Sequence, residues 1–356
     1  MRKLLYIAPH RQGRSPGQRF RFEQFMDYLT TNGVQITYSY LLNENDDKHF
    51  YSKGNYLYKI WIAIKGIFVR FFDVMRASKY DCIIVYREAH FLGFAWFEWA
   101  LSKFKATMIF DFDDAIWLND VSESNKNLKW LKSAAKTRKI AQYANVVTVG
   151  NSFLAEYAQT ANSNVVIIPT VIDTNVYTYN ESIEKEVVTI GWIGSLTTWK
   201  HFQEAIPVLV EIKKRYGTKV DFKVIVDDEF VIPELGIVST KWSKETELSE
   251  LKKVDIGIMP LPNDNWSKGK CGFKGIQYMS LGIATIMSPV GVNVDIINNG
   301  VNGFLAETKE EWIARLSQLI VDRELRKSLG SEARKTIVKN FSVISQQTNL
   351  LAIVYG

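Results

Sequence analysis

The stretch SKGKCGFKGIQYMSLGIATIMSPVG, Ser267–Gly291, is basic and glycine-rich in its first half and apolar in its second half. Residues 273–281 have the pattern of a short helix, which Gly282 would end, because a left-handed glycine commonly follows the last helical residue. Ala284–Ser288 is a continuous apolar run of the length typical of a buried strand. A helix that leads directly into a buried strand is one unit of an α/β fold with a parallel sheet.

Lysines and glycines precede this helix. They are Lys268, Lys270 and Lys274, set around Gly269, Cys271 and Gly272, with Phe273 as the first helical residue. A helix N-terminus attracts anions through its unpaired N–H groups and its dipole, and the lysines add positive charge at the same place. A basic run is usually a solvated face, but these lysines lie among glycines and beside an apolar helix. We therefore expect this loop to bind phosphate.

The rest of the chain alternates apolar, β-rich runs with amphipathic helical segments. In the first half the expected strands are Leu4–Ala8, Val34–Tyr40, Cys82–Tyr86, Ala106–Phe110 and Val146–Val149. In the second half they are Val187–Ile193, Asp221–Val226, Val254–Met259, Ala284–Ser288 and Gly303–Ala306. Helices are expected over Gln18–Asn32 and Phe202–Tyr216, among others. This alternation predicts two doubly wound α/β domains, each with a parallel sheet covered by helices on both faces.

Length and composition are consistent with that organisation. A chain of 356 residues favours two domains, and its 47% hydrophobic content excludes a disordered protein. The net charge of +6 suits anionic partners such as nucleotides or acidic lipids, but the basic residues are dispersed, so nucleic-acid binding is not expected. Two cysteines, Cys82 and Cys271, favour a reducing compartment. We find no signal peptide and no membrane-spanning stretch, and expect a cytoplasmic protein.

The segment VVIIPTVIDTNVYTYNESIEKE, around Pro169, separates the two sets of strands and reads as a linker, with a boundary near residues 170–186. In doubly wound sheets, ligands bind at the carboxyl ends of the strands, and with two such domains the cleft between them is the expected site. The loops that directly follow strands are therefore the candidate binding loops.

The first such loop is HRQGRSPGQRFR, residues 10–21. Gly13 and Gly17 allow close backbone approach, and a helix should begin near Pro16 or Gly17. Four arginines add positive charge: Arg11, Arg14, Arg19 and Arg21. The loop is either an anion site or a solvated basic loop. It does not have the GxGxxG pattern, so a dinucleotide fold of the usual kind is not supported.

Two further loops of the first half contain charged residues. In YREAHFLG, residues 86–93, Arg87 and Glu88 could pair with each other, and His90 is either packed or functional. In IFDFDDAIW, residues 109–117, three carboxylates follow a strand: Asp111, Asp113 and Asp114. They could bind Mg²⁺ or orient a substrate hydroxyl, or one of the last two could cap a helix.

The loop GWIGSLTTWKHF, residues 191–202, follows the first strand of the second half. Gly191 and Gly194 permit a tight turn, and Ser195 and Thr198 can cap the helix after it. Lys200 could reach a phosphate placed at that helix N-terminus. A plain strand-to-helix turn would explain the glycines equally well, but not the lysine.

Tyr56–Arg76 is a helical stretch rich in aromatic residues. Its charged residues fall within an arc of about 140° on a helical wheel: Lys59, Lys65, Arg70, Asp73 and Arg76. The opposite face holds Ile60, Trp61, Ile64, Phe68, Phe71, Phe72 and Met75. Such a helix either docks on an anionic membrane surface or turns its apolar face toward the core of the first domain.

Taken in order, GWIGS, VDIGIMPLP and FKGIQYMSLGIATIMSPVGVNVDIINNGVNGFL resemble the retaining glycosyltransferases of family 4, also called group 1, which have the GT-B architecture. The resemblance covers about residues 165–335, and SPGQRFR and FDFDD are similar to a subset of the family. It implies two Rossmann-like domains that face a central cleft. Residues 1–168 would be the acceptor-binding domain, 169–186 the linker, 187–335 the nucleotide-sugar-binding domain and 336–356 a helix that crosses back to the first domain.

The resemblance also implies roles for residues of the second domain. Gly194 and Ser195 would contact the donor diphosphate, and Lys200, with Lys270 or Lys274, would neutralise it. Gly272 and Phe273 begin the helix of the same donor site. Gln277 stands where the family has the second glutamate of its E-x7-E motif, and its carbonyl can still accept from a ribose hydroxyl.

The chain departs from the family at two further positions. Gly269 holds the position of the first glutamate of E-x7-E, and Asp113 stands where many relatives have the histidine of D-x-H-D. We expect Asp113 to position the acceptor or the donor sugar. The other expected acceptor-binding residues are Gly17, Arg19, Arg21, Arg87, His90, Asp111 and Asp114.

The expected activity is transfer of a hexosyl-type sugar, with retention, from a nucleotide diphosphate sugar to a hydroxyl acceptor. Lys270 and Lys274 would stabilise the leaving diphosphate, so neither a metal nor another cofactor is expected. The expected setting is bacterial surface polysaccharide or glycoconjugate assembly, with an acceptor that can be lipid-linked and with peripheral contact to the inner face of the plasma membrane. The alternative is a non-catalytic nucleotide-sugar-binding partner of another glycosyltransferase, which would keep the lysine loop and lose catalytic residues. A two-domain solute-binding protein is disfavoured, because such proteins need export.

Overall fold

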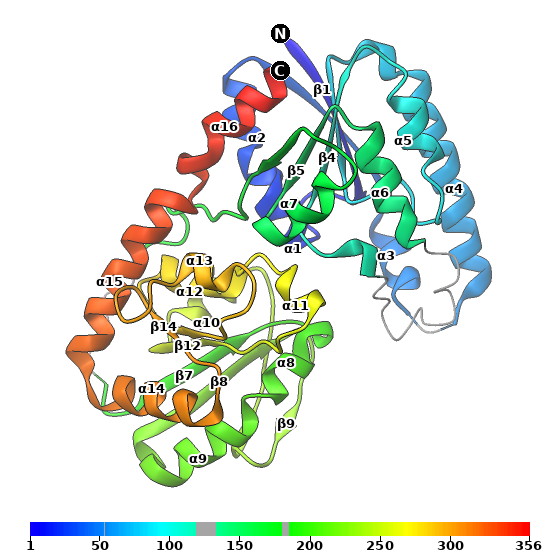
Figure 1. Cartoon of the computed structure of the whole chain (residues 1–356). Helices are drawn as coiled ribbons and strands as arrows, with labels where there is room; N and C mark the ends of the chain where they lie inside the picture. The colour runs from blue at the N-terminus through cyan, green and yellow to red at the C-terminus, as the bar shows by residue number, and fades with distance from the viewer. Residues whose placement is uncertain (53, 119–132, 180–184) are drawn as a thin grey trace. The chain divides into compact units, whose positions relative to one another are not determined.

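The computed structural model describes residues 1–52, 54–118, 133–179 and 185–356 (Figure 1). The chain divides into two compact units. The first unit consists of residues 1–170 and 346–356, and the second unit of residues 171–345. Residues 180–184, part of the expected linker, lie outside the described residues.

The first unit is built on a six-stranded parallel sheet with the strand order β2-β1-β3-β4-β5-β6. Its strands are β1 (Arg2–His10), β2 (Val34–Leu42), β3 (Cys82–Tyr86), β4 (Thr107–Phe112), β5 (Val146–Val149) and β6 (Val165–Ile167). The central strand β3 is buried along its whole length, as expected for an apolar strand that is covered on both faces. The expected doubly wound α/β architecture is confirmed in this unit.

Helices cover both faces of this sheet. They are α1 (Pro16–Arg21), α2 (Met26–Thr31), α3 (Glu44–Phe50), α4 (Tyr56–Met75), α5 (Trp96–Leu101), α6 (Ala134–Tyr143) and α7 (Ser152–Gln159), with 3-10 turns at Glu23–Phe25, Ala77–Lys79 and Ile116–Leu118. Figure 1 shows α4, α5 and α6 as one row on one side of the sheet. The single helix expected over Gln18–Asn32 is wrong: the chain leaves helical geometry at Phe22, whose ring stacks on Tyr6 at 4.0 Å between centroids.

The second unit has its own six-stranded parallel sheet, with the order β11-β8-β7-β12-β13-β14. Its strands are β7 (Val188–Ile193), β8 (Val220–Val226), β11 (Thr240–Lys241), β12 (Ile256–Met259), β13 (Ala284–Met287) and β14 (Phe304–Leu305), and β9 (Val231–Ile232) pairs with β10 (Ile237–Val238) as a separate antiparallel hairpin. A continuous apolar core lies between the sheet and its helices and includes Trp192, Phe202, Ile212 and Leu316.

The helices of the second unit also cover both sheet faces. They are α8 (Trp199–Gln203), α9 (Ile206–Tyr216), α10 (Glu247–Leu251), α11 (Asn265–Lys268), α12 (Phe273–Ser280), α13 (Asn293–Ile296), α14 (Lys309–Val321) and α15 (Arg323–Asn340), with 3-10 turns at Leu196–Thr198 and Gly217–Lys219; α16 (Val343–Tyr355) starts here and continues into the first unit. α9 packs with α14, and α12 packs with α15. The one helix expected over Phe202–Tyr216 is two helices, because Pro207 in the first turn of α9 has no N–H to continue the α8 ladder.

Glycines let α12 lie close to its neighbours. A Cβ at Gly257 on β12 would overlap the ring of Tyr278, and a Cβ at Gly330 on α15 would overlap the backbone carbonyl of Gly282. Gly282 follows α12 with φ +75°, so the expected left-handed stop of this helix is confirmed. This tight packing fixes the start of α12, which carries the lysine–glycine loop.

Helix α4 is turned the opposite way from an ordinary amphipathic helix. Its charged residues Arg70 and Asp73 are 0% and 1% exposed, whereas Trp61 and Phe68 are 56% and 60% exposed. The interpretation of this helix as one whose apolar face turns toward the core is therefore wrong. Within the described residues, none of the helices combines the length and hydropathy that crossing a bilayer requires, α4 included.

Candidate functional site

In the first unit, four of the expected acceptor-site residues come together at the carboxyl ends of β1, β3 and β4. The Arg87 guanidinium donates to Asp113 Oδ1 at 2.8 Å and to Asp114 Oδ2 at 2.6 Å. Tyr86 Oη donates to the same Asp113 Oδ1 at 2.9 Å. A Cβ at Gly17 would overlap the Tyr86 hydroxyl, so only glycine lets the loop after β1 approach this cluster.

Arg87 has φ +60°, a left-handed conformation that is uncommon for a non-glycine residue. Such strained residues gather at functional sites, where the surrounding structure holds them. Here the Arg87 N–H donates to the Asp111 carbonyl at 2.7 Å. The expected pairing of Arg87 with Glu88 is wrong, because Glu88 pairs with Lys136 at 2.8 Å.

Two other expected acceptor residues form a buried pair. Arg21 is 3% exposed, and its Nε donates to Asp111 Oδ2 at 3.2 Å, while Thr148 donates to Asp111 Oδ1 at 2.7 Å. This pair ties α1 to β4 and β5, which is a structural role. Arg19 lies apart from it, with its guanidinium over the Phe20 ring.

His90 is fully buried, with its Nε2 3.0 Å from the Ala63 carbonyl of α4. Burial lowers the pKa of this imidazole to about 4. The packed interpretation of His90 is therefore the one that fits, and a role in acceptor contact does not fit a side chain without solvent access.

The carboxylates after β4 are held by cations from the protein itself. Asp111 pairs with Arg21, and Asp113 and Asp114 pair with Arg87. In the described ranges, no group of three or more His, Cys, Asp or Glu side chains is arranged to hold a metal ion. Both Asp113 and Asp114 accept from the Arg87 guanidinium.

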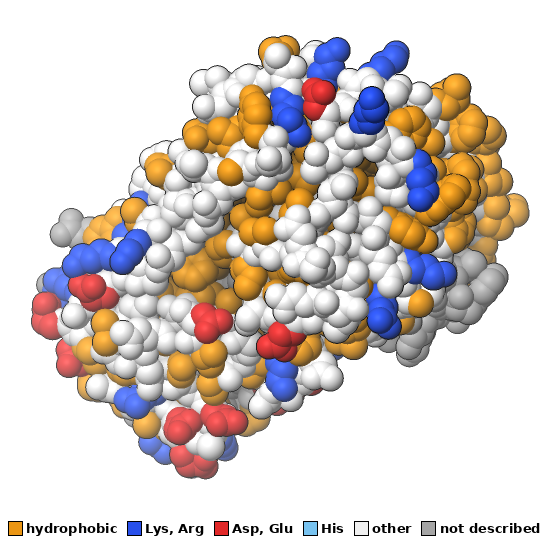
Figure 2. Space-filling model, turned by 45° about the horizontal axis from the view of Figure 1, so that its top comes forward, with side chains coloured by type: hydrophobic (Ala, Val, Ile, Leu, Met, Phe, Trp, Pro, Cys, Tyr) orange, Lys and Arg blue, Asp and Glu red, His pale blue; other side chains and the backbone are white. Residues whose placement is uncertain are grey.

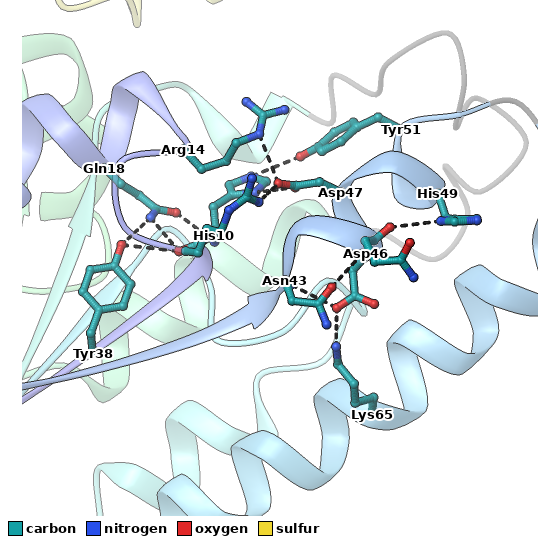
Figure 3. Close-up of polar contacts among 12 residues, drawn as sticks. His10, Arg14, Gln18, Tyr38, Asn43, Asp46, Asp47, His49, Tyr51 and Lys65 are labelled. Atoms are coloured by element: carbon teal, nitrogen blue, oxygen red, sulfur yellow. Dashed lines mark hydrogen bonds and ion pairs between the residues drawn. The ribbon is translucent and has the colours of Figure 1, made fainter. Parts of the chain in front are cut away.

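The basic loop after β1 meets a carboxylate that the sequence analysis did not connect with it (Figure 3). Asp47, on α3, accepts from Arg11 and from Arg14 Nε at 3.1 Å, and it lies 3.3 Å from His10 Nδ1. Burial alone would raise the pKa of Asp47, but the contacts with His10 and the two arginines outweigh it and leave the pKa lowered. Arg11 and Arg14 therefore share a carboxylate of the same unit, while Arg14 stays exposed.

The His10 ring is held from both sides in this cluster. Its Nε2 lies 3.1 Å from the Tyr51 hydroxyl, and its Nδ1 faces Asp47 (Figure 3). The neighbouring residue Asp46 closes a capping box with Asn43 at the start of α3, and it also pairs with Lys65 of α4. α3 therefore holds the loop after β1 through Asp47, and α4 in turn holds α3 through the Lys65–Asp46 pair.

In the second unit, the loop after β7 is shaped by hydrogen bonds to its own backbone. Ser195 and Thr198, expected to cap the next helix, form a capping box around the 3-10 turn Leu196–Thr198 instead, with the Ser195 N–H donating to Thr198 Oγ1 at 3.0 Å. The Leu196 N–H donates to Asp227 Oδ1, at the end of β8. A Cβ at Gly194 would overlap the Trp192 ring, so glycine is needed at this turn.

The lysine–glycine loop lies between α11 and α12. Asp264 caps α11 by accepting from the Ser267 N–H at 2.7 Å, and Gly272, with φ +67°, starts α12. Lys270 Nζ lies 4.5 Å from the centre of the Trp266 ring, and Lys274 Nζ lies 5.8 Å from that of Trp192. Both amines therefore rest on aromatic rings, an arrangement that holds a cation in place.

His201, on α8, is affected by lysines of both the loop after β7 and the lysine–glycine loop. It is 2% exposed, and neither ring nitrogen has a hydrogen-bond partner among the residues that the structure describes. Burial, together with the charges of Lys274, Lys270 and Lys200, lowers the pKa of His201 to about 4. The three lysines expected at the donor site thus act on one buried, neutral imidazole.

Gln277, on α12, belongs to a buried polar cluster. Its Nε2 donates at 3.1 Å to Glu247, which also accepts from Tyr177 and, at 2.6 Å, from Trp242 Nε1. A carboxylate can only accept, so the amide nitrogen of Gln277 must face Glu247. The amide carbonyl then points away from this carboxylate.

A pocket of about 400 Å³ lies at the carboxyl ends of β12 and β13 in the second unit. Its lining includes Pro207, Pro260, Pro262 and Pro289, together with Glu204, Lys309 and Trp312. None of the expected donor residues lines it. Pro260 and Pro289, which closely follow β12 and β13, are the sequence signal for this pocket.

Comparisons with known proteins give a family match for the second unit and a fold match for the whole chain. Residues 173–336 match the family model described as "Glycosyl transferases group 1", which confirms the resemblance seen in the sequence. A search of curated proteins finds no match.

Solved structures match the whole chain at low sequence identity. Sucrose-phosphate synthase from Thermosynechococcus elongatus has a TM-score of 0.75 at 12% identity, over 100% of this chain and 98% of that one. A glycosyltransferase from Rickettsia africae has a TM-score of 0.68 at 16% identity, over 99% and 97% of the two chains. Anabaena HepE, solved in complex with UDP and glucose, has a TM-score of 0.66 at 13% identity, over 100% of both chains. The expected GT-B fold class is confirmed.

Proposed function

We propose, from the group 1 match of the second unit and the GT-B fold of the chain, that this protein is a glycosyltransferase. It moves a hexosyl-type sugar from a nucleotide diphosphate sugar to a hydroxyl acceptor, with retention of anomeric configuration. The observation that carries the proposal is the match of residues 173–336 to the group 1 family model.

We assign the donor to the second unit. The leaving diphosphate gains negative charge as the sugar becomes oxocarbenium-like, and preorganised positive charge stabilises that state. Lys270 and Lys274 supply this charge, and Lys200 adds to it. Gly194 and Ser195 border the diphosphate at the turn after β7, where their own N–H groups donate to the Ile225 carbonyl and to Thr198 Oγ1. The start of α12 at Gly272 and Phe273 adds the positive end of a helix dipole. Lysines and helix dipoles fill the role of a divalent cation in this mechanism, which makes the transfer metal-independent.

We assign the contact with the ribose of the donor to Gln277. Glu247 holds its amide nitrogen, so the carbonyl oxygen is the group that accepts from a ribose hydroxyl. Gln277 therefore serves as a hydrogen-bond acceptor in place of the family glutamate, without the negative charge.

We assign the acceptor to the first unit. Asp113 positions the acceptor or the donor sugar. Arg87 donates to Asp113 and holds it in place, and Asp114 in turn accepts from Arg87. Gly17 keeps the backbone close to this carboxylate. Arg19 stays a candidate at the rim, whereas Arg21 and Asp111 act beneath the site as a structural pair.

The proposed setting is assembly of a bacterial surface polysaccharide or glycoconjugate, on the cytoplasmic side of the plasma membrane. A lipid-linked acceptor is fixed in the bilayer, so the enzyme must meet that bilayer to reach it. The apolar outward face of α4 supports this part of the proposal.

The test is a thermal-shift screen against UDP-, GDP- and other nucleotide sugars, followed by assays of donor hydrolysis and transfer with the best donor. We expect one nucleotide class to stabilise the protein and to be turned over, with NMR showing a retained anomeric configuration. Stabilisation without any turnover would instead identify a non-catalytic nucleotide-sugar-binding protein. An inverted product would reject the retaining mechanism.

A further inference from the structure

The outward face of α4 is apolar over the length of the helix. Ile60, Trp61, Phe68 and Phe72 are all more than half exposed. Soluble proteins rarely expose apolar side chains in such a continuous row unless something covers them.

The inward face of the same helix is fixed by buried polar contacts. Arg70 donates to Asp73 Oδ2 at 2.7 Å, to the Ala8 carbonyl at 2.8 Å and to the Ala89 carbonyl at 2.5 Å. Lys59 donates to the Ser52 carbonyl at 2.7 Å. If α4 rotated about its axis to bury its apolar face, Arg70, Asp73 and Lys59 would lose these hydrogen-bond partners. These buried contacts therefore fix the orientation in which the apolar face points outward.

Helix α5 extends this apolar surface. It packs beside α4 and exposes Trp96 and Trp99. Figure 2 shows hydrophobic side chains gathered over this edge of the first unit, with Lys and Arg side chains beside them. We name Ile60, Trp61, Phe68, Phe72, Trp96 and Trp99 the α4–α5 face.

The exposed charged side chains of the segments 54–80 and 91–106, which carry this face, have one sign. Asp73 is the only acidic residue between positions 54 and 80, and Glu98 the only one between 91 and 106, and both are buried. The exposed charged side chains of the same two segments are basic: Lys79, Lys103 and Lys105. An apolar, tryptophan-bearing surface rimmed by basic residues complements an anionic lipid surface, where tryptophan prefers the interface and each basic residue adds attraction.

We propose that the α4–α5 face docks the protein on an anionic lipid bilayer. Its side chains enter the boundary between head groups and acyl chains, while Lys103 and Lys105 contact lipid phosphates. The biological meaning of this docking rests on the proposed transfer to a lipid-linked acceptor, but the binding itself needs no sugar transfer. A second copy of the chain is a poorer occupant, because two such faces would bring lysines of the same sign together.

The test is flotation of the full chain with two kinds of vesicle, phosphatidylcholine alone and phosphatidylcholine mixed with phosphatidylglycerol. We expect the wild type to float with the mixed vesicles and weakly with the neutral ones. Trp61→Ser, Phe68→Ser and Phe72→Ser should each lower the partition coefficient roughly tenfold. Lys103→Gln and Lys105→Gln should each lower it about fivefold, with the mixed vesicles only.

The matched control is Val231→Ser with Val321→Ser, which removes exposed apolar side chains from the second unit, where they are 70% and 72% exposed. This variant should bind as the wild type does, and circular dichroism melts should show every variant folded. The proposal is overturned if the wild type does not float with the mixed vesicles, or if the three serine variants together float normally. It is also overturned if light scattering finds a lipid-free dimer that those variants dissociate, because the face would then join two copies.

The same variants separate this inference from the proposed function. Donor hydrolysis measured without vesicles should be unchanged by the serine substitutions. If the wild type floats with the vesicles but hydrolyses no donor, the proposed transferase activity is rejected and the proposed docking surface is not.

Discussion

Lys270 and Lys274 are the residues on which the proposed chemistry depends most. Each amine rests on a tryptophan ring, and each contributes to the low pKa of His201. Lys270→Ala or Lys274→Ala should lower transfer by about a hundredfold, because removing one preorganised donor costs roughly 3 kcal/mol in the barrier. Lys335→Ala, on the exposed side of α15, is the control and should be silent. Normal rates in both site variants would exclude this donor site.

His201 and His90 predict how stability depends on pH. Both are buried, and burial lowers each pKa from 6.5 to about 4. Because the folded pKa is depressed, the unfolded chain binds protons first as the pH falls. Each histidine therefore contributes its full stability above pH 6.5 and loses it between pH 6.5 and 4, up to roughly 3 kcal/mol.

Urea unfolding of the wild type and of His201→Gln at pH 7 and pH 4 measures this contribution. The variant should lose less stability between the two pH values than the wild type, by an amount approaching the contribution of one histidine. The same fall in both proteins would mean that His201 titrates as an exposed histidine does.

At the scale of elements, the strands were predicted best. β3 and β5 have the expected bounds, and α12 stops before the left-handed Gly282 as expected, because continuous apolar runs and a left-handed glycine are local signals. The break at Phe22 depends on stacking against Tyr6, which no local pattern contains. Element type therefore follows from nearby residues, while interruptions follow from tertiary contacts.

Helix α4 shows the limit of a periodicity argument. The helical wheel of Tyr56–Arg76 separates charged from apolar positions correctly, but it does not show which of the two faces packs against the sheet. That choice depends on Arg70, whose partners lie at the ends of β1 and β3, far away in the sequence. The same holds for the candidate site, where Asp47 pairs with arginines of the loop after β1.

The buried Arg70–Asp73 pair should therefore behave as a unit. Arg70→Met should destabilise the protein by about 3–5 kcal/mol, because it leaves a buried carboxylate without its closest cation. Adding Asp73→Leu should recover a large part of that loss, although Arg76 and Ser39 lose their partner as well. Urea unfolding of both single variants and the double variant gives the coupling energy. Additive losses would show that the two charges do not depend on each other.

At the scale of the whole molecule, the two halves differ in how much the sequence reveals. The family match ends with the second unit, whose glycines and lysines form a compact local pattern. The first unit has a sheet of the same kind, but its candidate site combines residues such as Gly17 and Tyr86, which are far apart in sequence and meet only after folding. Fold class is thus readable along the whole chain, whereas site geometry is readable mainly where its residues are close in sequence.

The end of the chain belongs to the first unit, which makes the stability of that unit dependent on α16. Leu350 and Val354 are buried, Tyr355 Oη donates to the Asn32 carbonyl at 2.9 Å, and the two termini lie close together (Figure 1). Leu350→Ala with Val354→Ala should cost about 4 kcal/mol through lost burial and the cavities left behind. Hydrogen exchange should then speed up in β1, β2 and α2 while β12 and β13 stay protected. Ile344→Ala, on the exposed side of the same helix, should leave both units unchanged. Equal acceleration in both sheets would instead mean that the two units unfold as one, and that α16 stabilises the chain as a whole.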